Sequence, residues 1–328
     1  MTEAFDVLPG IMLPVREVTS QLASMWEVDQ PDSSPTFHAS QMNVVLHFGL
    51  NTKPEIAREQ FDGLVRFAQR YPCRIIVLCP SKVNLGNAME SKLFSQCYIG
   101  ESHREMCCCE ALILRYDPLD SEYLFNQVSI WLESDLPTYY WFSGVPVQQV
   151  ESYLEALSKL GVYRCIFDSS DESMDLGSLN WASGFGLSDL AEARLLPLRQ
   201  VIGQFLSRYP DNTICEGLQT IQVRHTAESG EGRPLLKWLK SCLDECGGRE
   251  KETAESTEFL LKAFESASAC SLEVEFTYTD KKYFAFAWLD NDQRCELRAN
   301  FGESEEVVYV PAKELTLEQV LGEAFFFR

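Results

Sequence analysis

Two apolar stretches decide the fold: residues 42–50 are MNVVLHFGL, and residues 73–79 are CRIIVLC. Neither stretch alternates apolar with polar side chains, which is typical of strands buried on both faces of a parallel sheet. Thr52 and Glu55 fit a capping box at the start of a helix between them. The apolar side chains of that helix fall on one stripe: Ala57, Phe61, Leu64, Val65 and Ala68. The pattern predicts a β-α-β unit with a right-handed crossover.

Strand and helix patterns keep alternating up to residue 168. Further strands are expected over 107–116, 137–142 and 163–168, with helices between them. Repeated β-α-β units favour a parallel sheet that is covered by helices. We therefore expect an α/β domain over 39–177, with a mixed, largely parallel sheet and flanking helices. Residues 1–38 hold four prolines and are interpreted as an irregular N-terminal lead-in.

A smaller α+β domain is expected over residues 178–328. The stretch before it, 168–186, is rich in Ser, Asp and Gly, which is typical of a domain junction. The second domain is predicted to open with a helix from Ser188 to Tyr209 that is bent or restarted at Pro197.

The apolar period changes within this second domain. Residues 259–264 are expected to complete a helix, and the period then shortens from 3.6 to 2. Apolar side chains alternate with polar ones through 274–278, 284–288 and 295–301. Turns between these runs predict an antiparallel meander. A final helix is expected to start at Thr316.

The charge of the chain limits its partners. The 328 residues include 28 Lys and Arg against 49 Asp and Glu, which gives a formal net charge of −21. Such a surface repels phosphate backbones and anionic lipid, so we expect neither nucleic acid nor membrane as a partner. Glu3 and Asp6 stand where a signal peptide has a basic start and an apolar stretch. We expect a cytoplasmic protein.

Twelve cysteines are present, but no C-x-x-C pair occurs among them. Disulfide frameworks belong to small secreted domains, and this chain is long enough to build a core, so reduced and mostly buried thiols are expected. Cys242 and Cys246 share one helix face, which makes them the redox candidates, with a third thiol as a possible partner. Their position on an apolar stripe with Leu235 and Leu239 favours buried packing. No metal site is predicted, because none of the four histidines lies near a cysteine at the spacing that zinc ligands have.

No catalytic or cofactor motif is found. The turn after the first strand, residues 49–54, is GLNTKP and holds one glycine where a dinucleotide fingerprint needs three. Neither a P-loop nor a G-x-S-x-G elbow occurs. His47 lies in an apolar strand and is interpreted as a hydrogen-bonded core residue. We expect no cofactor and no enzyme. The alternative is an enzyme or sugar-phosphate binder that uses the strand ends near 49–52 or 143–146.

Five segments resemble a known family. Residues 70–78 (RYPCRIIVL), 108–115 (CCEALILR), 136–146 (LPTYYWFSGVP), 167–169 (FDS) and 189–199 (DLAEARLLPLR) are similar, in order and spacing, to motifs of the glucose-6-phosphate dehydrogenase assembly proteins called OpcA. The chain departs from the family pattern at three positions, where Cys73 replaces serine and Glu192 and Leu198 replace tryptophans. It is identified as a divergent member.

The resemblance implies a non-catalytic assembly factor or allosteric activator. Its partner would be glucose-6-phosphate dehydrogenase, in the oxidative pentose phosphate pathway. Thiol-dependent control has been proposed for related members, which keeps Cys242 and Cys246 as candidates.

Two segments are candidates for the contact with that partner. Arg194 and Arg199 are about 140° apart on a helix and are interpreted as pairing either with internal carboxylates or with an acidic patch on the dehydrogenase. Four aromatic residues in a row are interpreted as core, with any exposed ring serving as an interface anchor: Tyr139, Tyr140, Trp141 and Phe142.

Overall fold

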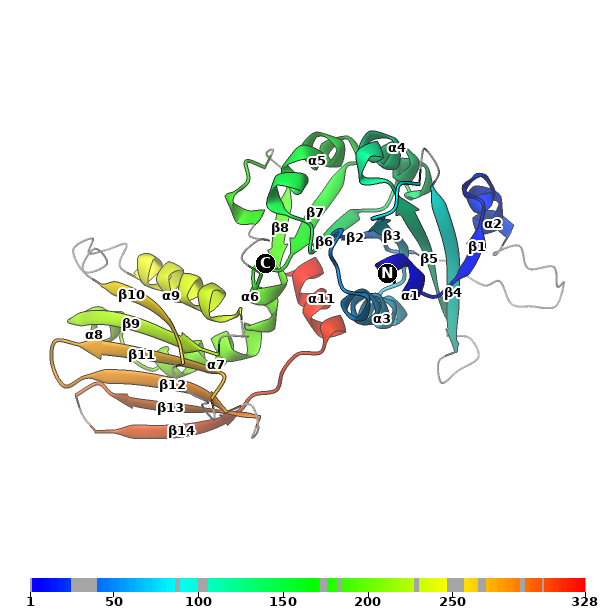
Figure 1. Ribbon diagram of the computed structural model, residues 1–328. Helices are drawn as coiled ribbons and strands as arrows, with labels where there is room; N and C mark the ends of the chain where they lie inside the picture. Colours follow the sequence, from blue (N-terminus) through cyan, green and yellow to red (C-terminus); the bar gives the residue numbers. More distant parts are fainter. Residues whose placement is uncertain are drawn as a thin grey trace. The chain divides into compact units, whose positions relative to one another are not determined.

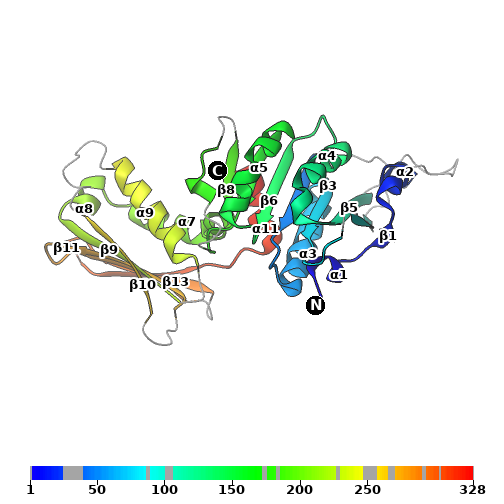
Figure 2. The ribbon, with the colours of Figure 1, turned by 45° about the horizontal axis from the view of Figure 1, so that its top comes forward.

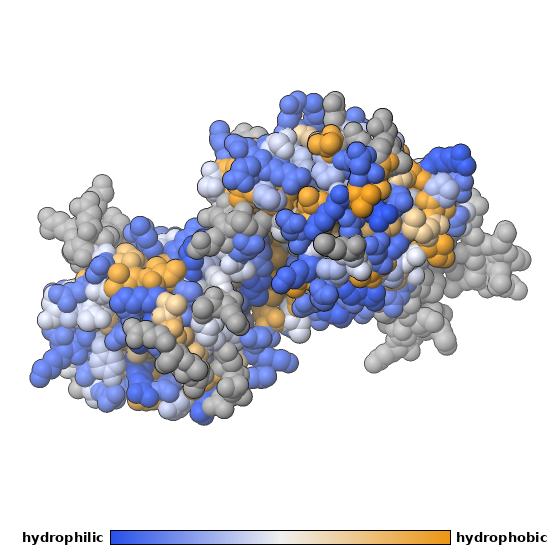
Figure 3. All heavy atoms as spheres, in the orientation of Figure 1, coloured by the Kyte–Doolittle hydropathy of each residue, from blue (hydrophilic) through white to orange (hydrophobic). Residues whose placement is uncertain are grey.

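The computed structural model describes residues 2–24, 40–85, 89–99, 106–171, 176–181, 185–226, 230–246, 257–264, 270–289, 293–302 and 304–327. The chain divides into two compact units. The first comprises Met1–Asp168, Ser173–Asp189 and Leu317–Arg328, and the second comprises Ser169–Glu172 and Leu190–Thr316. No described helix is long and apolar enough to cross a membrane. Hydrophilic side chains predominate on the face shown in Figure 3, as the net charge of −21 leads one to expect.

The first unit is built on an eight-stranded sheet in the order β1-β4-β5-β3-β2-β6-β7-β8 (Figure 1). Its strands are β1 (Ile11–Leu13), β2 (Met42–Phe48), β3 (Cys73–Pro80), β4 (Glu90–Ile99), β5 (Met106–Tyr116), β6 (Thr138–Ser143), β7 (Val162–Phe167) and β8 (Gly186–Asp189). Strands β5, β3, β2, β6, β7 and β8 run parallel, whereas β4 pairs antiparallel with β5 and β1. The prediction of a mixed, largely parallel sheet is confirmed.

Helices cover both faces of this sheet (Figure 1). One face packs against α4 (Ser121–Trp131) and α5 (Val147–Lys159), through strand side chains such as Val45 and Phe142. The other face carries α3 (Pro54–Arg70) and the C-terminal α11 (Leu317–Phe326). Because successive side chains of a strand point to opposite faces, strands covered on both sides need apolar residues throughout. The N-terminal residues add the short helices α1 (Ala4–Val7) and α2 (Val18–Ser24).

The predicted capping box at the start of α3 is wrong. The helix begins at Pro54, and its N-cap is Lys53, which makes no side-chain capping bond. Proline suits the first turn because the amide hydrogen that it lacks has no helical partner there. Thr52 instead turns away and donates its hydroxyl hydrogen to the carbonyl of Ser143, at 3.3 Å.

Two motif residues form an ion pair inside the first sheet. Arg74 of β3 lies in register with Glu110 of β5, and its Nε donates to the Glu110 carboxylate at 2.6 Å. The Glu110 side chain is 2% exposed and that of Arg74 is 16% exposed. A second bond, also 2.6 Å long, joins Arg74 to Glu133 after α4. Arg74 therefore ties two neighbouring strands to the end of a helix.

The second unit is a six-stranded sheet in the order β10-β9-β11-β12-β13-β14. Its strands are β9 (Leu218–His225), β10 (Glu258–Ala263), β11 (Leu272–Tyr278), β12 (Tyr283–Leu289), β13 (Arg294–Asn300) and β14 (Glu306–Pro311). Strands β11 to β14 form the predicted antiparallel meander, lengthened by β14. The helix expected over 259–264 is wrong, because those residues form β10 and pair in parallel with β9.

Helices α7 (Leu196–Leu206), α8 (Asp211–Cys215) and α9 (Gly232–Cys246) lie on one side of this sheet (Figure 2). The single helix expected from Ser188 to Tyr209 is wrong in part. Ser188 lies in β8, α6 (Leu190–Arg194) follows, and α7 starts one residue before Pro197. The predicted restart at this proline is therefore confirmed.

The last helix departs from the expected division at 177/178. Residues 178–328 were expected to form one domain, but α11 belongs to the first unit. Arg164 of β7 donates to the carbonyls of Ala324, Phe325 and Phe327 at 2.9–3.1 Å and so satisfies the end of α11. The ring of Phe325 stacks on Tyr139 of β6 at 4.9 Å. A local sequence pattern does not indicate which sheet an apolar helix will cover.

The Arg74 pair predicts a large loss of stability on truncation. Arg74→Met should lower the free energy of unfolding by about 3 kcal/mol, because it leaves the Glu110 carboxylate buried without its partner. The control is Arg58→Met, which breaks the exposed pair Arg58–Asp62 on α3 and should change the value by less than about 0.5 kcal/mol. Urea unfolding of both variants measures the difference. Equal effects would contradict a structural role for Arg74.

Candidate functional site

The place to look for a ligand site is the edge between β2 and β6. Strand β3, the next strand of the sheet core along the chain, lies on one side of β2, and β6 lies on its other side. This is the topological switch point of the sheet, where open α/β folds bind ligands at the carboxyl ends of their strands. The loops that follow the two strands, residues 49–53 and 144–146, are the segments that the alternative interpretation named.

The two loops touch each other through their backbones. A Cβ atom built on Gly49 would lie 1.7 Å from the carbonyl oxygen of Gly144, far inside van der Waals contact. The Gly49 amide donates to the carbonyl of Ser143 at 2.8 Å. Gly144 has a φ of 67°, in the left-handed region that favours glycine. The contact therefore uses glycine on both sides, and it carries the main-chain contact between β2 and β6 one residue beyond the paired strands.

Side-chain hydrogen bonds also link the segments at this edge. The Ser143 hydroxyl donates to Gln60 of α3 at 2.6 Å, and Thr52 donates to the carbonyl of Ser143. The N-terminus of α3, which would face a phosphate, has Pro54 at its first turn and thus one backbone donor fewer. The hydrogen-bonding groups of this edge are thus directed at one another.

A cavity of about 470 Å³ lies elsewhere in the first unit, between α4 and α5. Its floor includes Phe125 and Tyr153, and its rim includes Ser129, Ser152 and Lys159. It lies over a helix pair and not at the strand ends, so it does not restore the site that the alternative interpretation required.

His47 is the centre of a buried polar cluster on β2. Its Nδ1 lies 2.8 Å from the hydroxyl of Tyr140, and its Nε2 lies 2.6 Å from the hydroxyl of Tyr116. The imidazole stacks on Tyr153 of α5 at 5.6 Å, and Gln149 donates to the Tyr153 hydroxyl at 2.6 Å. Burial lowers the pKa of His47 to about 3. The ring is neutral and satisfied at both nitrogens, so the interpretation of a hydrogen-bonded core histidine is confirmed.

The redox candidates lie on α9 at the edge of the second unit. Cys242 is half-buried and Cys246 is exposed, and Cys215 of α8 is near enough for the charge of Cys246 to act on it. Partial burial raises the pKa of all three thiols. A raised pKa reduces the thiolate fraction at neutral pH and slows thiol exchange. A redox role for Cys242 and Cys246 stays a prediction, with Cys215 as the third thiol.

The two arginine candidates make contacts inside the second unit. Arg194 of α6 pairs with Glu231 at 3.3 Å. The guanidinium of Arg199 on α7 lies 5.1 Å from the ring centre of Trp238 on α9. These contacts favour the first of the two interpretations, internal pairing. A contact of either arginine with the dehydrogenase stays a prediction.

The aromatic candidates are not a surface. Tyr139, Tyr140, Trp141 and Phe142 are at most 6% exposed. They form most of β6, which lies between β2 and β7 and is covered by helices on both faces. The expectation of an exposed interface anchor among them is therefore wrong, and their packing in the core is confirmed.

The structure describes only one of the three remaining histidines. His38 and His103 lie outside the described residues. His225 contacts the carbonyl of Thr226 at 2.7 Å through Nδ1. Within the described ranges, no three His, Cys, Asp or Glu side chains come together as metal ligands.

The sequence reasoning missed the contact between the two loops, although it named both. The available signal was that Gly49 and Gly144 each follow a strand of the same parallel sheet, so both occur at one edge. It also missed that Arg74 and Glu110, from two different motifs, form a pair. The signal there was an arginine in one apolar strand and a glutamate in another.

The glycine contact makes a sharp prediction. Gly49→Ala should lower the free energy of unfolding by about 2–3 kcal/mol, because the new methyl group must displace the Gly144 backbone. Gly203→Ala on α7 is the matched control: no atom lies within 4 Å of its added Cβ, so it should be stabilising by about 0.5–1 kcal/mol. Thermal or urea unfolding distinguishes them. A Gly49→Ala protein as stable as the wild type would show that the loops separate easily.

The buried imidazole predicts a dependence of stability on pH. Its folded pKa, about 3, is below the unfolded value of about 6.5, so below pH 6.5 the unfolded chain binds a proton that the folded chain does not. Stability should therefore fall with decreasing pH, by about 2 kcal/mol between pH 7.5 and pH 5 from this residue alone. His47→Gln should be less stable at pH 7.5 but should lack this decrement. Parallel pH profiles for the two proteins would rule out a buried neutral His47.

Part of the chain is similar to a known protein family. Residues 65–180 match the family described as the glucose-6-phosphate dehydrogenase subunit N-terminal domain, OpcA. A protein of Synechococcus elongatus named as an OxPP cycle protein, OpcA, is 28% identical over 145 residues, which are 43% of this chain. The match spans 31% of that relative, about a third of its length.

Two of the solved structures with a similar fold are oxidoreductases. Glucose-6-phosphate 1-dehydrogenase from Mycobacterium avium has a TM-score of 0.49 and 13% identity, over 87% of each chain. Aldose-aldose oxidoreductase from Caulobacter crescentus has a TM-score of 0.40 and 12% identity, over 86% of this chain and 87% of that one.

The family match covers four of the five motifs on which the resemblance was based, at 70–78, 108–115, 136–146 and 167–169. The match and the motifs agree, and residues 65–180 of this chain are similar to the family described as the glucose-6-phosphate dehydrogenase subunit N-terminal domain, OpcA.

Proposed function

We propose that this protein is a non-catalytic partner of glucose-6-phosphate dehydrogenase that raises the assembled or active fraction of the enzyme. The family of residues 65–180 supports the association with that enzyme. The observation that carries the non-catalytic part is the backbone contact between Gly49 and Gly144. It joins the two loops that follow the switch-point strands, where a doubly wound sheet would hold a dinucleotide, and the loop after β2 has one glycine where a dinucleotide fingerprint needs three.

The chemistry of the first unit supports the same proposal. A general base needs a pKa near the working pH, and the pKa of His47 is about 3. Burial also raises the pKa of Tyr116 and Tyr140, the two residues that contact its ring. The cluster therefore holds a fixed protonation state at neutral pH. It stabilises a rigid core more readily than it transfers protons.

A partner of this kind acts through differential binding. A protein that bound the active and inactive states of the dehydrogenase equally well would leave their ratio unchanged. The proposal therefore requires higher affinity for the assembled or active state, and a tenfold preference corresponds to about 1.4 kcal/mol. Arg194 and Arg199, both in the second unit, stay proposed contact residues.

The proposal predicts an effect on the enzyme of the same organism. Adding the purified protein at micromolar concentration should raise the dehydrogenase rate at fixed enzyme, or increase the mass of the enzyme particle in light scattering. The protein alone should turn over neither glucose 6-phosphate nor NADP⁺. Serum albumin at equal concentration is the control for non-specific stabilisation.

Two results would contradict the proposal. The first is the absence of both a complex and a rate change up to about 50 μM, a concentration at which even weak specific pairs associate. The second is turnover by the protein alone, which would restore the enzyme interpretation.

A further inference from the structure

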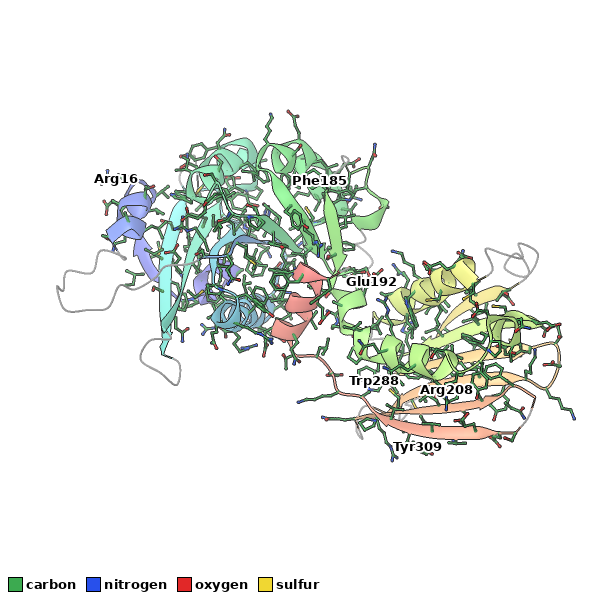
Figure 4. The ribbon with its side chains drawn as sticks, turned by 180° about the vertical axis from the view of Figure 1, so that it is seen from behind. Arg16, Phe185, Glu192, Arg208, Trp288 and Tyr309 are labelled. Carbon is green, nitrogen blue, oxygen red and sulfur yellow. The ribbon has the colours of Figure 1, made fainter. Side chains whose placement is uncertain are left out.

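The sheet of the second unit has one covered face and one open face. Its inner side chains pack with α7 and α9 in one core, to which all strands of the meander contribute. Trp288 of β12 packs in this core, whereas Tyr309 of β14 is 52% exposed; both are labelled in Figure 4. Among the described residues, the helices that contact this sheet do so from the inner side, as Figure 2 shows. We call the other side the open face.

The middle of the open face is low and flat. Ala285 and Ala287 occupy the outward positions of β12, and the charged neighbours on β11 and β13 rise on either side. A hollow of about 320 Å³ lies over them, with Glu275, Glu296 and Arg298 in its walls. Small residues in the middle of a sheet let another surface approach the backbone closely.

The open face is electrically balanced within a strongly acidic protein. Its strands present four basic side chains, Arg224, Lys262, Arg294 and Arg298, and four acidic ones, Glu258, Glu273, Glu275 and Glu296. The sum is 4 − 4 = 0, whereas the whole chain has a net charge of −21. Two copies of an acidic chain repel each other over most of their surfaces, so a neutral face is where they can approach.

We propose that the open face is the interface of a symmetric homodimer, in which a second copy of this chain packs its own open face over β12. The inference goes beyond the proposed function and does not rest on it. A two-fold axis parallel to β12 lays β11 of one copy over β13 of the other. Residues at the same height then face each other, because Glu275, Ala285 and Arg298 are aligned across the three strands.

The charges suit this arrangement. Glu275 of each copy comes opposite Arg298 of the other, so the contact forms twice, as an isologous interface requires. Within one chain Arg298 already pairs with Glu296, and Glu275 lies 3.5 Å from Arg224, so the contact would extend these ion pairs across the two copies. In the next row, Glu273 of one copy comes opposite Glu296 of the other. Arg224 lies 3.0 Å from Glu273 and offsets the repulsion between these two carboxylates. Sheets that pack face to face with nearly aligned strands are a common arrangement.

The face is large enough for a small interface. Five strands overlap in this arrangement, β9 and β11 to β14, and at about 4.8 Å apart and about six residues long they cover roughly 24 Å by 20 Å, or about 480 Å² per copy. Two copies would bury about 960 Å², near the lower limit for specific complexes. The exposed Val307 and Tyr309 of β14 supply apolar and aromatic area at its margin.

Ala287→Arg tests the interface. Residue 287 lies between Glu273 and Glu296 in the sheet, so an arginine there has partners within its own chain and should not unfold it. Its length blocks the hollow. Ser241→Arg, on an exposed position of α9, adds the same charge away from the face and is the control. Sedimentation equilibrium should show a wild-type dimer, an unchanged control, and a dissociation constant raised on the order of tenfold or more for Ala287→Arg.

Three results would overturn the proposal. The first is a wild-type protein that stays monomeric up to about 50 μM, where an interface of this size should associate. The second is an Ala287→Arg protein that dimerises like the wild type. The third is a monomeric wild type whose complex with the dehydrogenase is lost on Ala287→Arg but kept on Ser241→Arg, which would assign the face to that partner. Circular dichroism and the melting temperature of each variant establish that it is folded.

Discussion

The backbones of Gly49 and Gly144 lie so close that neither loop could take its present path with a side chain at position 49. This steric constraint joins the ends of β2 and β6, the two strands between which the order of the strands along the chain reverses. Everything near them follows from it: Thr52 turns toward Ser143, α3 begins at Pro54, and Gln60 accepts the Ser143 hydroxyl. The two loops at the switch point of the sheet are therefore held to each other by main-chain contacts.

The family motifs are explained largely by the interior of the first unit. Arg74 and Glu110 come from two motifs and pair across neighbouring strands. The aromatic motif forms buried β6 and ends in the Gly144 loop. Residues of this kind specify a scaffold, since a buried charge pair is costly to break and fixes the register of its strands. A protein that works by contact and not by turnover needs such a scaffold more than it needs an open pocket.

The sequence was most informative where one local pattern determined one structure. Residues 42–48 and 73–79 could be assigned to strands because apolar runs of that length fit only a sheet covered on both faces. It failed where the outcome depended on distant partners. Residues 258–263 have helical spacing but complete a sheet beside β9, and α11 packs on the first sheet after a chain excursion through the whole second unit. The Gly49–Gly144 contact joins residues 95 positions apart, so no window of sequence contains it.

A binding measurement on the isolated protein tests the non-catalytic role most directly. Titration of the purified chain with NADP⁺, followed by calorimetry, should show no saturable heat up to about 1 mM, because the loop after β2 has one glycine where a dinucleotide fingerprint needs three. Saturable binding with a dissociation constant in the micromolar range, abolished in a folded Gly49→Ala protein, would contradict that role and place a ligand at the end of β2.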